Sequence, residues 1–213
     1  NGAGKSTTFG ILAGWLNPTS GTSYVLNTPS QELSKLGGQI AALPQDAAFP
    51  PQISVKQELT HFGRLMGLSK SDAWKETERV LEAVSLQNAA TQRGSELSHG
   101  MAKRIGIAQT LIGAPKVIFL DEPTAGLDPA SARQIKDLIA TLTPQTTVVI
   151  SSHNLSDIEE ICTHGAILER GNMTISGTIG ELTRQSNEIS IEVQSNRAIP
   201  QGELESEFGL GSV

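Results

Sequence analysis

Hydrophobic residues in this chain follow two patterns. Short runs rich in β-branched residues predict strands, and longer segments in which apolar positions recur every three or four residues predict amphipathic helices. The two patterns alternate along the chain, which is typical of a parallel sheet with crossover helices, so we predict an α/β fold. The strands are expected near residues 22–26, 39–43, 117–120, 146–151 and 165–168, with a late hairpin through Gly171 and Asn172.

The strand pattern disappears between residues 54 and 112, where we predict three helices. One of them, over residues 72–84, carries Val80, Leu81 and Val84 on one face, which is the spacing of a helix that buries one side. We therefore expect a helical subdomain over residues 54–112, inserted into an α/β domain that extends to residue 186.

The last segment, residues 187–213, has a different character. Ile189, Ile191 and Val193 alternate with polar residues and predict a strand, and the periodicity is lost from residue 200 onward. We treat this segment as a C-terminal extension and assign it no chemistry.

Charge and cysteine content narrow the possible functions. The formal net charge is −6 and the isoelectric point is near 5.2, whereas sequence-independent binding to nucleic acid needs a basic surface, so we expect no nucleic-acid partner. Cys162 is the one cysteine of the sequence and fits a reducing compartment such as the cytosol. No apolar run approaches the roughly 20 residues of a membrane-spanning helix. The chain starts without methionine or a secretory leader, so we expect a truncated start.

The first candidate chemistry lies at the start of the chain. Residues 1–7 match the last part of G-x-x-x-x-G-K-[ST], a loop whose backbone N–H groups cradle nucleotide phosphates. In that interpretation Lys5 supplies a positive charge and Ser6 holds magnesium. The alternative is a glycine-rich helix start with an ordinary lysine. The residues expected to bind the nucleotide are Asn1, Gly2, Ala3, Gly4, Lys5, Ser6 and Thr7.

Two carboxylates, Asp121 and Glu122, follow the apolar run 117–120. In parallel sheets, ligands bind beyond the carboxyl ends of the strands. Adjacent residues that leave a strand point in different directions, so we expect Asp121 to face magnesium and Glu122 to act as the catalytic base on the attacking water. A helix-capping aspartate beside a solvated glutamate is the alternative.

Gln45 follows one predicted strand and opens the helical insert, and His153 follows another predicted strand. The Gln45 amide could bind magnesium or contact the water, and the His153 imidazole could touch the γ-phosphate and sense its loss. A lone glutamine or a loop histidine is more often simply solvated. The other three histidines show no repeated spacing with cysteines or acids, so we expect no zinc site. They are His61, His99 and His164.

Taken in order, these motifs resemble the nucleotide-binding domains of ABC transporters. The series includes residues 97–101, which are similar to the family signature L-S-G-G-Q, and residues 126–128. The resemblance covers residues 1–186 and implies a P-loop NTPase fold, mostly a parallel sheet flanked by helices with an inserted helical subdomain. It also implies ATP and Mg²⁺ as cofactors. Two such domains pair head to tail, so Ser98 and Gly100 of one would close over the ATP of the other.

This sequence departs from the family signature at two positions, with His99 in place of the usual glycine and Met101 in place of glutamine. A bulky His99 could weaken the paired state or make it pH-sensitive, or it could be tolerated because Ser98 and Gly100 are kept. By resemblance, Asp128 helps to orient catalytic groups across the interface. Asp128 also suits a helix N-cap before a proline, and both roles can hold together.

The resemblance implies an ATP-hydrolysing subunit that powers a separate transmembrane permease subunit, contacted near residues 45–55 and the helical insert. We expect it beside a second ATP-binding subunit, in the cytoplasm and peripheral on the inner face of the membrane. Residues 124–129 and 176–182 look most like the ABC-2 kind, which favours export. The alternatives are a soluble ABC ATPase and a weakly hydrolytic regulatory domain. Because the family places its adenine-stacking aromatic residue upstream of the phosphate loop, we expect the isolated chain to bind nucleotide weakly.

Overall fold

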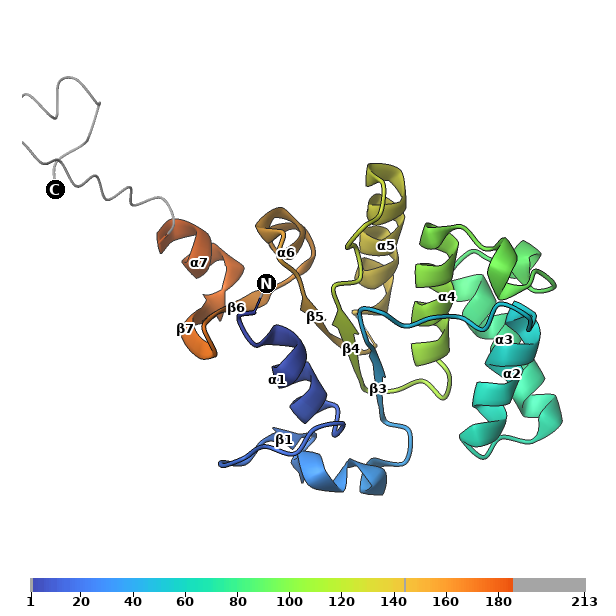
Figure 1. Ribbon diagram of the computed structural model, residues 1–213, viewed down its shortest axis with the longest axis horizontal. Helices are drawn as coiled ribbons and strands as arrows, with labels where there is room; N and C mark the ends of the chain where they lie inside the picture. The colour runs from blue at the N-terminus through green and yellow to red at the C-terminus, as the bar shows by residue number, and fades with distance from the viewer. Residues whose placement is uncertain (1, 144, 186–213) are drawn as a thin grey trace, which may run out of the picture. The chain divides into compact units, whose positions relative to one another are not determined.

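A computed structural model describes residues 2–143 and 145–185 of the chain (Figure 1). Two compact units divide between Ile179 and Gly180. The predicted strand in residues 189–193 lies outside the described residues, as does Asn1. All elements discussed below, up to β7, belong to the first unit.

A parallel three-stranded sheet in the order β3-β4-β5 lies at the centre of the first unit. Its strands are β3 (Ile40–Leu43), β4 (Val117–Asp121) and β5 (Thr147–Ser151). The register places Leu43 beside Leu120, and Asp121 beside Ser151. All three strands therefore end at one edge, and the structure confirms the strands predicted at 39–43, 117–120 and 146–151.

One face of the sheet packs against α1 (Lys5–Leu12). Val117 and Phe119 of β4 are buried on this face, where the Phe9 ring meets the Phe119 ring edge-on with centroids 5.7 Å apart. Figure 1 shows α1 lying beside the sheet. This contact fixes the helix that follows the glycine-rich loop.

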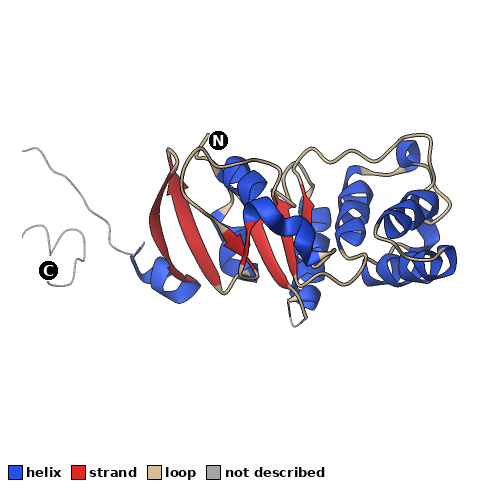
Figure 2. Ribbon diagram, turned by 90° about the horizontal axis from the view of Figure 1, so that it is seen from below, coloured by secondary structure: helices blue, strands red, loops and turns tan. Residues whose placement is uncertain are grey.

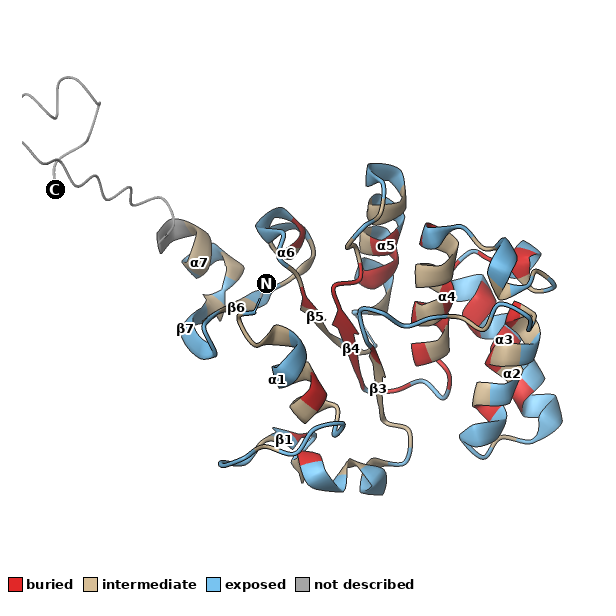
Figure 3. Cartoon of the chain, viewed as in Figure 1, coloured by how far each residue is buried: buried red, intermediate tan, exposed pale blue. Residues whose placement is uncertain are grey.

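The other face of β4 carries Ile118 and Leu120, which are fully buried in a larger cluster. That cluster is completed by α4 (His99–Thr110) and α5 (Pro129–Leu142). The strand is buried on both faces (Figure 3), as its unbroken apolar run requires. Successive side chains alternate between the two clusters, as strand geometry dictates.

The segment predicted as a helical subdomain contains α2 (Val55–Leu65), α3 (Lys70–Ala83) and α4, so the three predicted helices are present. Figure 2 shows this region as helices without strands. Val80, Leu81 and Val84, predicted to share a face, are all buried. Two short 3₁₀ helices lie between α3 and α4, namely η2 (Gln87–Ala89) and η3 (Gly94–Glu96).

Two predicted strands lie outside the parallel sheet and form antiparallel hairpins. β1 (Tyr24–Val25) pairs with β2 (Thr28–Pro29), and β6 (His164–Glu169) pairs with β7 (Asn172–Thr178). In both hairpins the two connecting residues have positive φ. A two-residue turn of that kind can join only antiparallel strands, so short-range turn geometry decided these pairings.

Two further elements of the first unit are the 3₁₀ segment η1 (Ser30–Leu36) and α6 (Leu155–Ile161). After β7, α7 (Ile179–Gln185) begins at the last residue of the first unit and continues into the second. Within the part of the chain that the structure describes, no helix is both long enough and apolar enough to cross a membrane.

Glu76 and Arg79 form an ion pair within α3, and both hydrogen-bond to backbone groups at the end of α4 and in the loop that follows it. The Glu76 carboxylate accepts hydrogen bonds from Arg79, at 2.6 Å, and from the Gly113 backbone N–H, at 2.8 Å. Arg79 also donates to the Leu111 carbonyl oxygen at 2.7 Å. The Arg79 hydrogen bond, aided by Gly113, holds the pKa of Glu76 below its ordinary value, against the opposing effect of burial.

We expect Glu76→Gln to lower the free energy of unfolding by about 1 kcal/mol at neutral pH. Because the folded-state pKa of Glu76 is lowered, its contribution is present above the ordinary glutamate pKa and is lost as the pH falls through the folded-state value. Urea unfolding at several pH values would measure this. Glu82→Gln, at an exposed position of the same helix, should change little. A loss that is independent of pH would contradict the prediction.

Candidate active site

The glycine-rich loop at the start of the chain leads directly into α1. Gly2 and Gly4 have φ values of 85° and 98°, in the left-handed region that favours glycine. Gly4 is the N-cap of α1, and its carbonyl oxygen accepts from the Thr8 N–H at 2.9 Å. The first N–H groups of a helix have no partner within the helix, and they create a site for anions.

The turn between β6 and β7 supports this loop from behind. Gly171, in the turn, donates its backbone N–H to the Ala3 carbonyl oxygen at 3.0 Å. A Cβ atom on Gly4 would lie 3.6 Å from the Gly171 Cα atom, so the two backbones approach closely. The sequence analysis did not predict this contact, which joins residues near opposite ends of the described chain.

A pocket of about 300 Å³ opens over the loop. It brings together three separately predicted parts of the site: the glycine-rich loop, the glutamine after β3 and the glutamate after β4. The lining residues are Gly2, Ala3, Gly4, Lys5, Ser6, Thr7, Gln45 and Glu122. Of the residues predicted to bind nucleotide, Asn1 alone lies outside the described residues.

Glu122 is the centre of the pocket's electrostatics. It is 4% exposed and has a φ of 49°, an unusual backbone conformation for a residue with a side chain. One carboxylate oxygen, Oε1, lies 3.5 Å from Lys5 Nζ. The other, Oε2, lies 2.8 Å from His153 Nδ1 and accepts from the His153 backbone N–H at 3.3 Å. Lys5 and His153 thus hold the carboxylate from both sides.

Asp121 lies directly behind Glu122 and is buried. Its Oδ1 atom accepts a hydrogen bond from the Ser151 hydroxyl, which in turn accepts from the Glu122 N–H at 3.0 Å. Ser151 is a site residue that the sequence analysis missed. Its signal was available, because the predicted strands at 117–120 and 146–151 end at one sheet edge, where a serine would come opposite an aspartate.

Gln45 follows β3 and also lines the pocket. The backbone carbonyl oxygen of Gln45 accepts a hydrogen bond from Lys103 Nζ of α4 at 2.7 Å. Burial lowers the pKa of Lys103, whereas the charges of nearby carboxylates, including Asp121 and Glu122, act in the opposite direction. The sequence gives no signal for this contact, because the two residues are 58 positions apart.

The residues of the predicted signature lie at the start of α4. Ser98 is the N-cap, and its hydroxyl accepts from the Met101 N–H at 3.2 Å. Gly100 is buried, and a Cβ atom there would lie 2.7 Å from the Ser131 hydroxyl oxygen, so a side chain at this position would have to displace Ser131 of α5. The lining of the phosphate-loop pocket includes neither Ser98 nor Gly100.

Asp128 caps α5, as its position before a proline predicted. One of its carboxylate oxygens accepts from the N–H groups of Ala130 and Ser131, both at 3.0 Å. Hydrogen bonding to Ser131 holds the pKa of Asp128 below its ordinary value. The exposed His99 ring comes close to the same loop, with Nε2 3.9 Å from where a Gly126 Cβ atom would lie. Asp128 does not line the phosphate-loop pocket either.

Comparison with known proteins is decisive for the family. A family model described as ABC transporter matches residues 1–125. The chain belongs to the ABC transporter family. As an ABC ATP-binding domain, it is 38% identical to the ABC transporter ATP-binding protein YxlF of Bacillus subtilis, over 87% of this chain and 61% of YxlF. It is 34% identical to an ABC transporter ATP-binding protein of Alkalihalophilus pseudofirmus, over 93% of this chain and 74% of that protein.

A further relative is the human retinal-specific phospholipid-transporting ATPase ABCA4, which is 34% identical over 84% of this chain but only 8% of its own length. Among solved structures, cbiO1 of Clostridium perfringens, part of the ABC transporter complex cbiONQ, matches with a TM-score of 0.76 and 29% identity, over 87% of this chain and 77% of cbiO1. The ATP-binding cassette MJ0796 matches with a TM-score of 0.74 at 23% identity, over 83% of this chain and 81% of that chain. These likenesses confirm the P-loop NTPase fold.

We expect Ser151→Ala to lower the free energy of unfolding by about 1–3 kcal/mol, because the buried Asp121 carboxylate loses a donor and the Glu122 N–H loses an acceptor. Ser152→Ala is the matched control. The Ser152 hydroxyl accepts only one described hydrogen bond, from the N–H of Asn154 in an exposed turn, so its loss should cost about 0.5 kcal/mol or less. Chemical denaturation would measure both, and equal losses would contradict the assignment of Ser151 to the site.

Proposed function

We propose that this ABC domain binds and hydrolyses ATP and powers the export of a substrate through a separate transmembrane subunit. The observation that carries the proposal is the buried Glu122 carboxylate, held between Lys5 and His153 at the phosphate-loop pocket. A buried carboxylate beside an anion site, with a lysine and a histidine in reach, suits a water-activating base.

The arrangement assigns a task to each of these residues. The ATP phosphates would lie in the pocket, where the loop N–H groups and Lys5 bind their negative charge. Glu122 would accept a proton from the attacking water as the new P–O bond forms and the bond to the ADP oxygen breaks. His153, 63% exposed at its side chain, is free to turn from Glu122 to the γ-phosphate.

The side chains at the pocket suit Mg²⁺. Ser6 and Gln45 both line the pocket, and the buried Asp121 directly precedes the lining residue Glu122. Hydroxyl, amide and carboxylate oxygens are the donors that Mg²⁺ prefers, together with substrate phosphates. When bound, Mg²⁺ would neutralise charge on the β- and γ-phosphates. We propose Ser6, Gln45 and Asp121 as the residues that hold it.

A second ATP-binding subunit is part of the proposal. Ser98, Gly100 and Asp128 do not line the pocket of their own chain, which supports a role for them at the pocket of a paired subunit. MJ0796 has been seen as a dimer bound to ADP and Pi.

A groove on the helical subdomain suits the membrane partner. It has a volume of about 940 Å³ and includes Trp74, which is 46% exposed beneath Lys56 Nζ at 2.9 Å from the ring centre. Its lining contains four cations and no carboxylate: Lys56, Arg64, Lys70 and Arg93. None of the four forms an ion pair with another described residue. In a chain of net charge −6, this groove favours an acidic cytoplasmic segment of the permease.

The relative ABCA4 is named as a phospholipid-transporting ATPase. The likeness of residues 124–129 and 176–182 to the ABC-2 kind is the reason that we propose export. We place the protein in the cytoplasm, peripheral on the inner face of the membrane. The half-buried thiol of Cys162, whose pKa burial raises, is compatible with a reducing compartment.

The first test is magnesium-dependent ATP hydrolysis by the full-length natural protein at increasing protein concentration. We expect turnover to rise more than linearly, because two subunits complete each site, and Glu122→Gln to lower kcat at least about 100-fold. ATP binding without turnover in the wild type would instead support the regulatory alternative, for which His99 in the signature is the specific observation.

The second test addresses the groove. Arg64→Glu combined with Lys70→Glu should weaken co-purification with the membrane subunit at least about tenfold, because two attractive charges become repulsive. ATP hydrolysis by the isolated subunit should stay unchanged. Lys75→Glu, an exposed residue of α3 that does not line the groove, is the control. Equal weakening by the control would show that net charge matters and the groove does not.

A further inference from the structure

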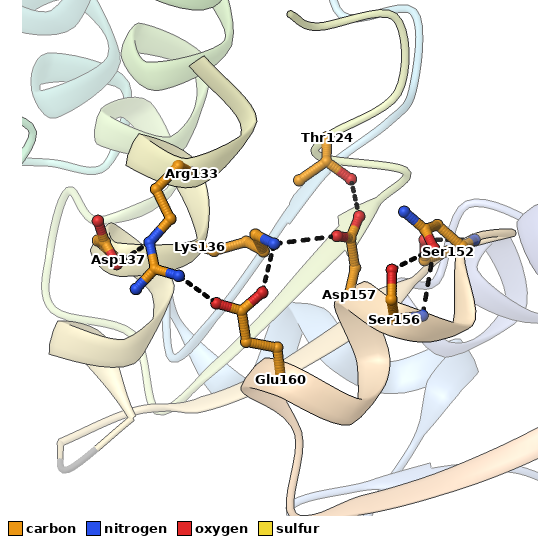
Figure 4. Close-up of polar contacts among 9 residues, drawn as sticks. Thr124, Arg133, Lys136, Asp137, Ser152, Ser156, Asp157 and Glu160 are labelled. Atoms are coloured by element: carbon orange, nitrogen blue, oxygen red, sulfur yellow. Dashed lines mark hydrogen bonds and ion pairs between the residues drawn. The ribbon is translucent and has the colours of Figure 1, made fainter. Parts of the chain in front are cut away.

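A chain of polar contacts connects the loop after Glu122 with α5 and α6 (Figure 4). The Thr124 hydroxyl donates to Asp157 Oδ2 at 2.8 Å, and Asp157 Oδ1 lies 3.3 Å from Lys136 Nζ. Lys136 continues to Glu160, and Glu160 to Arg133. The contacts therefore run from a loop beside the catalytic glutamate, through α6, to the outer surface of α5.

The two ends of this network of polar contacts differ in how far their side chains are buried. Asp157 is 7% exposed and the Lys136 side chain 16% exposed, whereas the Arg133 side chain is 62% exposed. An ionised carboxylate in a buried position needs partners to offset the loss of water, so Asp157 depends on Thr124 and Lys136. The outer pairs around Arg133 lie in water and contribute little.

The inner end joins the same two loops that meet at the active site. Glu122 contacts His153, and two residues after Glu122, Thr124 contacts Asp157, which lies four residues after His153. The loops after β4 and β5 are thus connected twice. The contact between Glu122 and His153 would change when ATP binds, because both side chains would then face the phosphates. The contact between Thr124 and Asp157 would not change, because neither side chain lines the pocket.

Asp157 also anchors the far end of the first loop. Lys136 is part of α5, and the N-cap of α5 is Asp128, the last residue of the loop. At the start of this loop, Thr124 contacts Asp157 of α6. After the loop, Lys136 of α5 contacts the same Asp157 carboxylate. The Asp157 carboxylate therefore contacts the loop near its start and also contacts α5, the helix into which the loop leads.

We propose that Asp157 is a positioning residue for hydrolysis. It keeps the backbones that carry Glu122 and His153 at a fixed separation when ATP binding breaks the contact between these two side chains. This inference rests on the proposed ATPase function. Asp157 acts through Thr124 and Lys136 and does not touch the phosphate-loop pocket. Its loss should therefore slow the chemical step and leave nucleotide binding intact.

The test variant is Thr124→Val, which removes the hydroxyl and keeps the β-branched shape. In the full-length protein we expect kcat for ATP hydrolysis to fall about tenfold, because the base is less well held, and KM to change less than twofold. Thr124→Ser restores the hydroxyl and should recover most of kcat. Arg133→Gln, at the exposed end of the same network, is the matched control and should leave kcat unchanged.

Asp157→Asn is a second variant that weakens the same contact, from the carboxylate side. If the two residues act as a unit, the double variant Thr124→Val, Asp157→Asn should be no slower than the slower single variant. Independent, multiplying losses would overturn the proposal. So would a fall in kcat that Thr124→Ser does not reverse, or a rise in KM without loss of kcat.

Hydrogen exchange without nucleotide separates this inference from the proposed function. Amides in residues 122–128 and 152–157 should exchange faster in Thr124→Val than in the wild type or in Arg133→Gln. A wild type without turnover would refute the ATPase function, and the exchange rates would still decide whether Asp157 connects the two loops. Unchanged exchange in Thr124→Val would overturn the connection.

Discussion

The parallel pairing of β4 with β5 is the constraint on which the active site depends. It places Asp121 beside Ser151 and brings Glu122 and His153 into contact at one sheet edge. A shift of one residue in this register would turn every side chain of the strand to the opposite face. The double-sided burial of β4 prevents such a shift, because Phe119 and Leu120 belong to two different apolar clusters.

Burying a carboxylate at this sheet edge is unfavourable, and neighbouring side chains offset the unfavourable free energy. Glu122 is a buried carboxylate on a left-handed backbone, two features that destabilise a fold unless the surroundings compensate. Lys5, His153 and Ser151 supply the compensation. Because Lys5 and His153 would also contact nucleotide, ligand binding would rearrange two of the contacts that stabilise Glu122 in the absence of ATP, and the contact with Ser151 would remain.

Helix caps serve two purposes in this domain. Ser98 and Asp128 are sequence-local N-caps of α4 and α5, each satisfied by N–H groups of its own helix. We propose the same two residues for the contact with a second subunit. Stability therefore explains their presence within one chain, and Gly100 is likewise explained by the close approach of Ser131.

The sequence by itself determined the α/β class, the strands of the parallel sheet and the three helices of the insert. It also contains the phosphate-loop motif and the Asp121 and Glu122 motif. Each of these depends on local periodicity, capping residues or a short motif, all of which can be read from neighbouring residues. The sequence predicted the hairpin through Gly171 and Asn172, which is present as β6 and β7, but it did not determine that the strand near residues 22–26 also pairs in a hairpin. Only the tertiary structure decided the contacts of Lys103 with Gln45, Gly171 with Ala3, and Asp157 with Thr124. These join residues from distant parts of the chain, and no local pattern records which of them folding brings together.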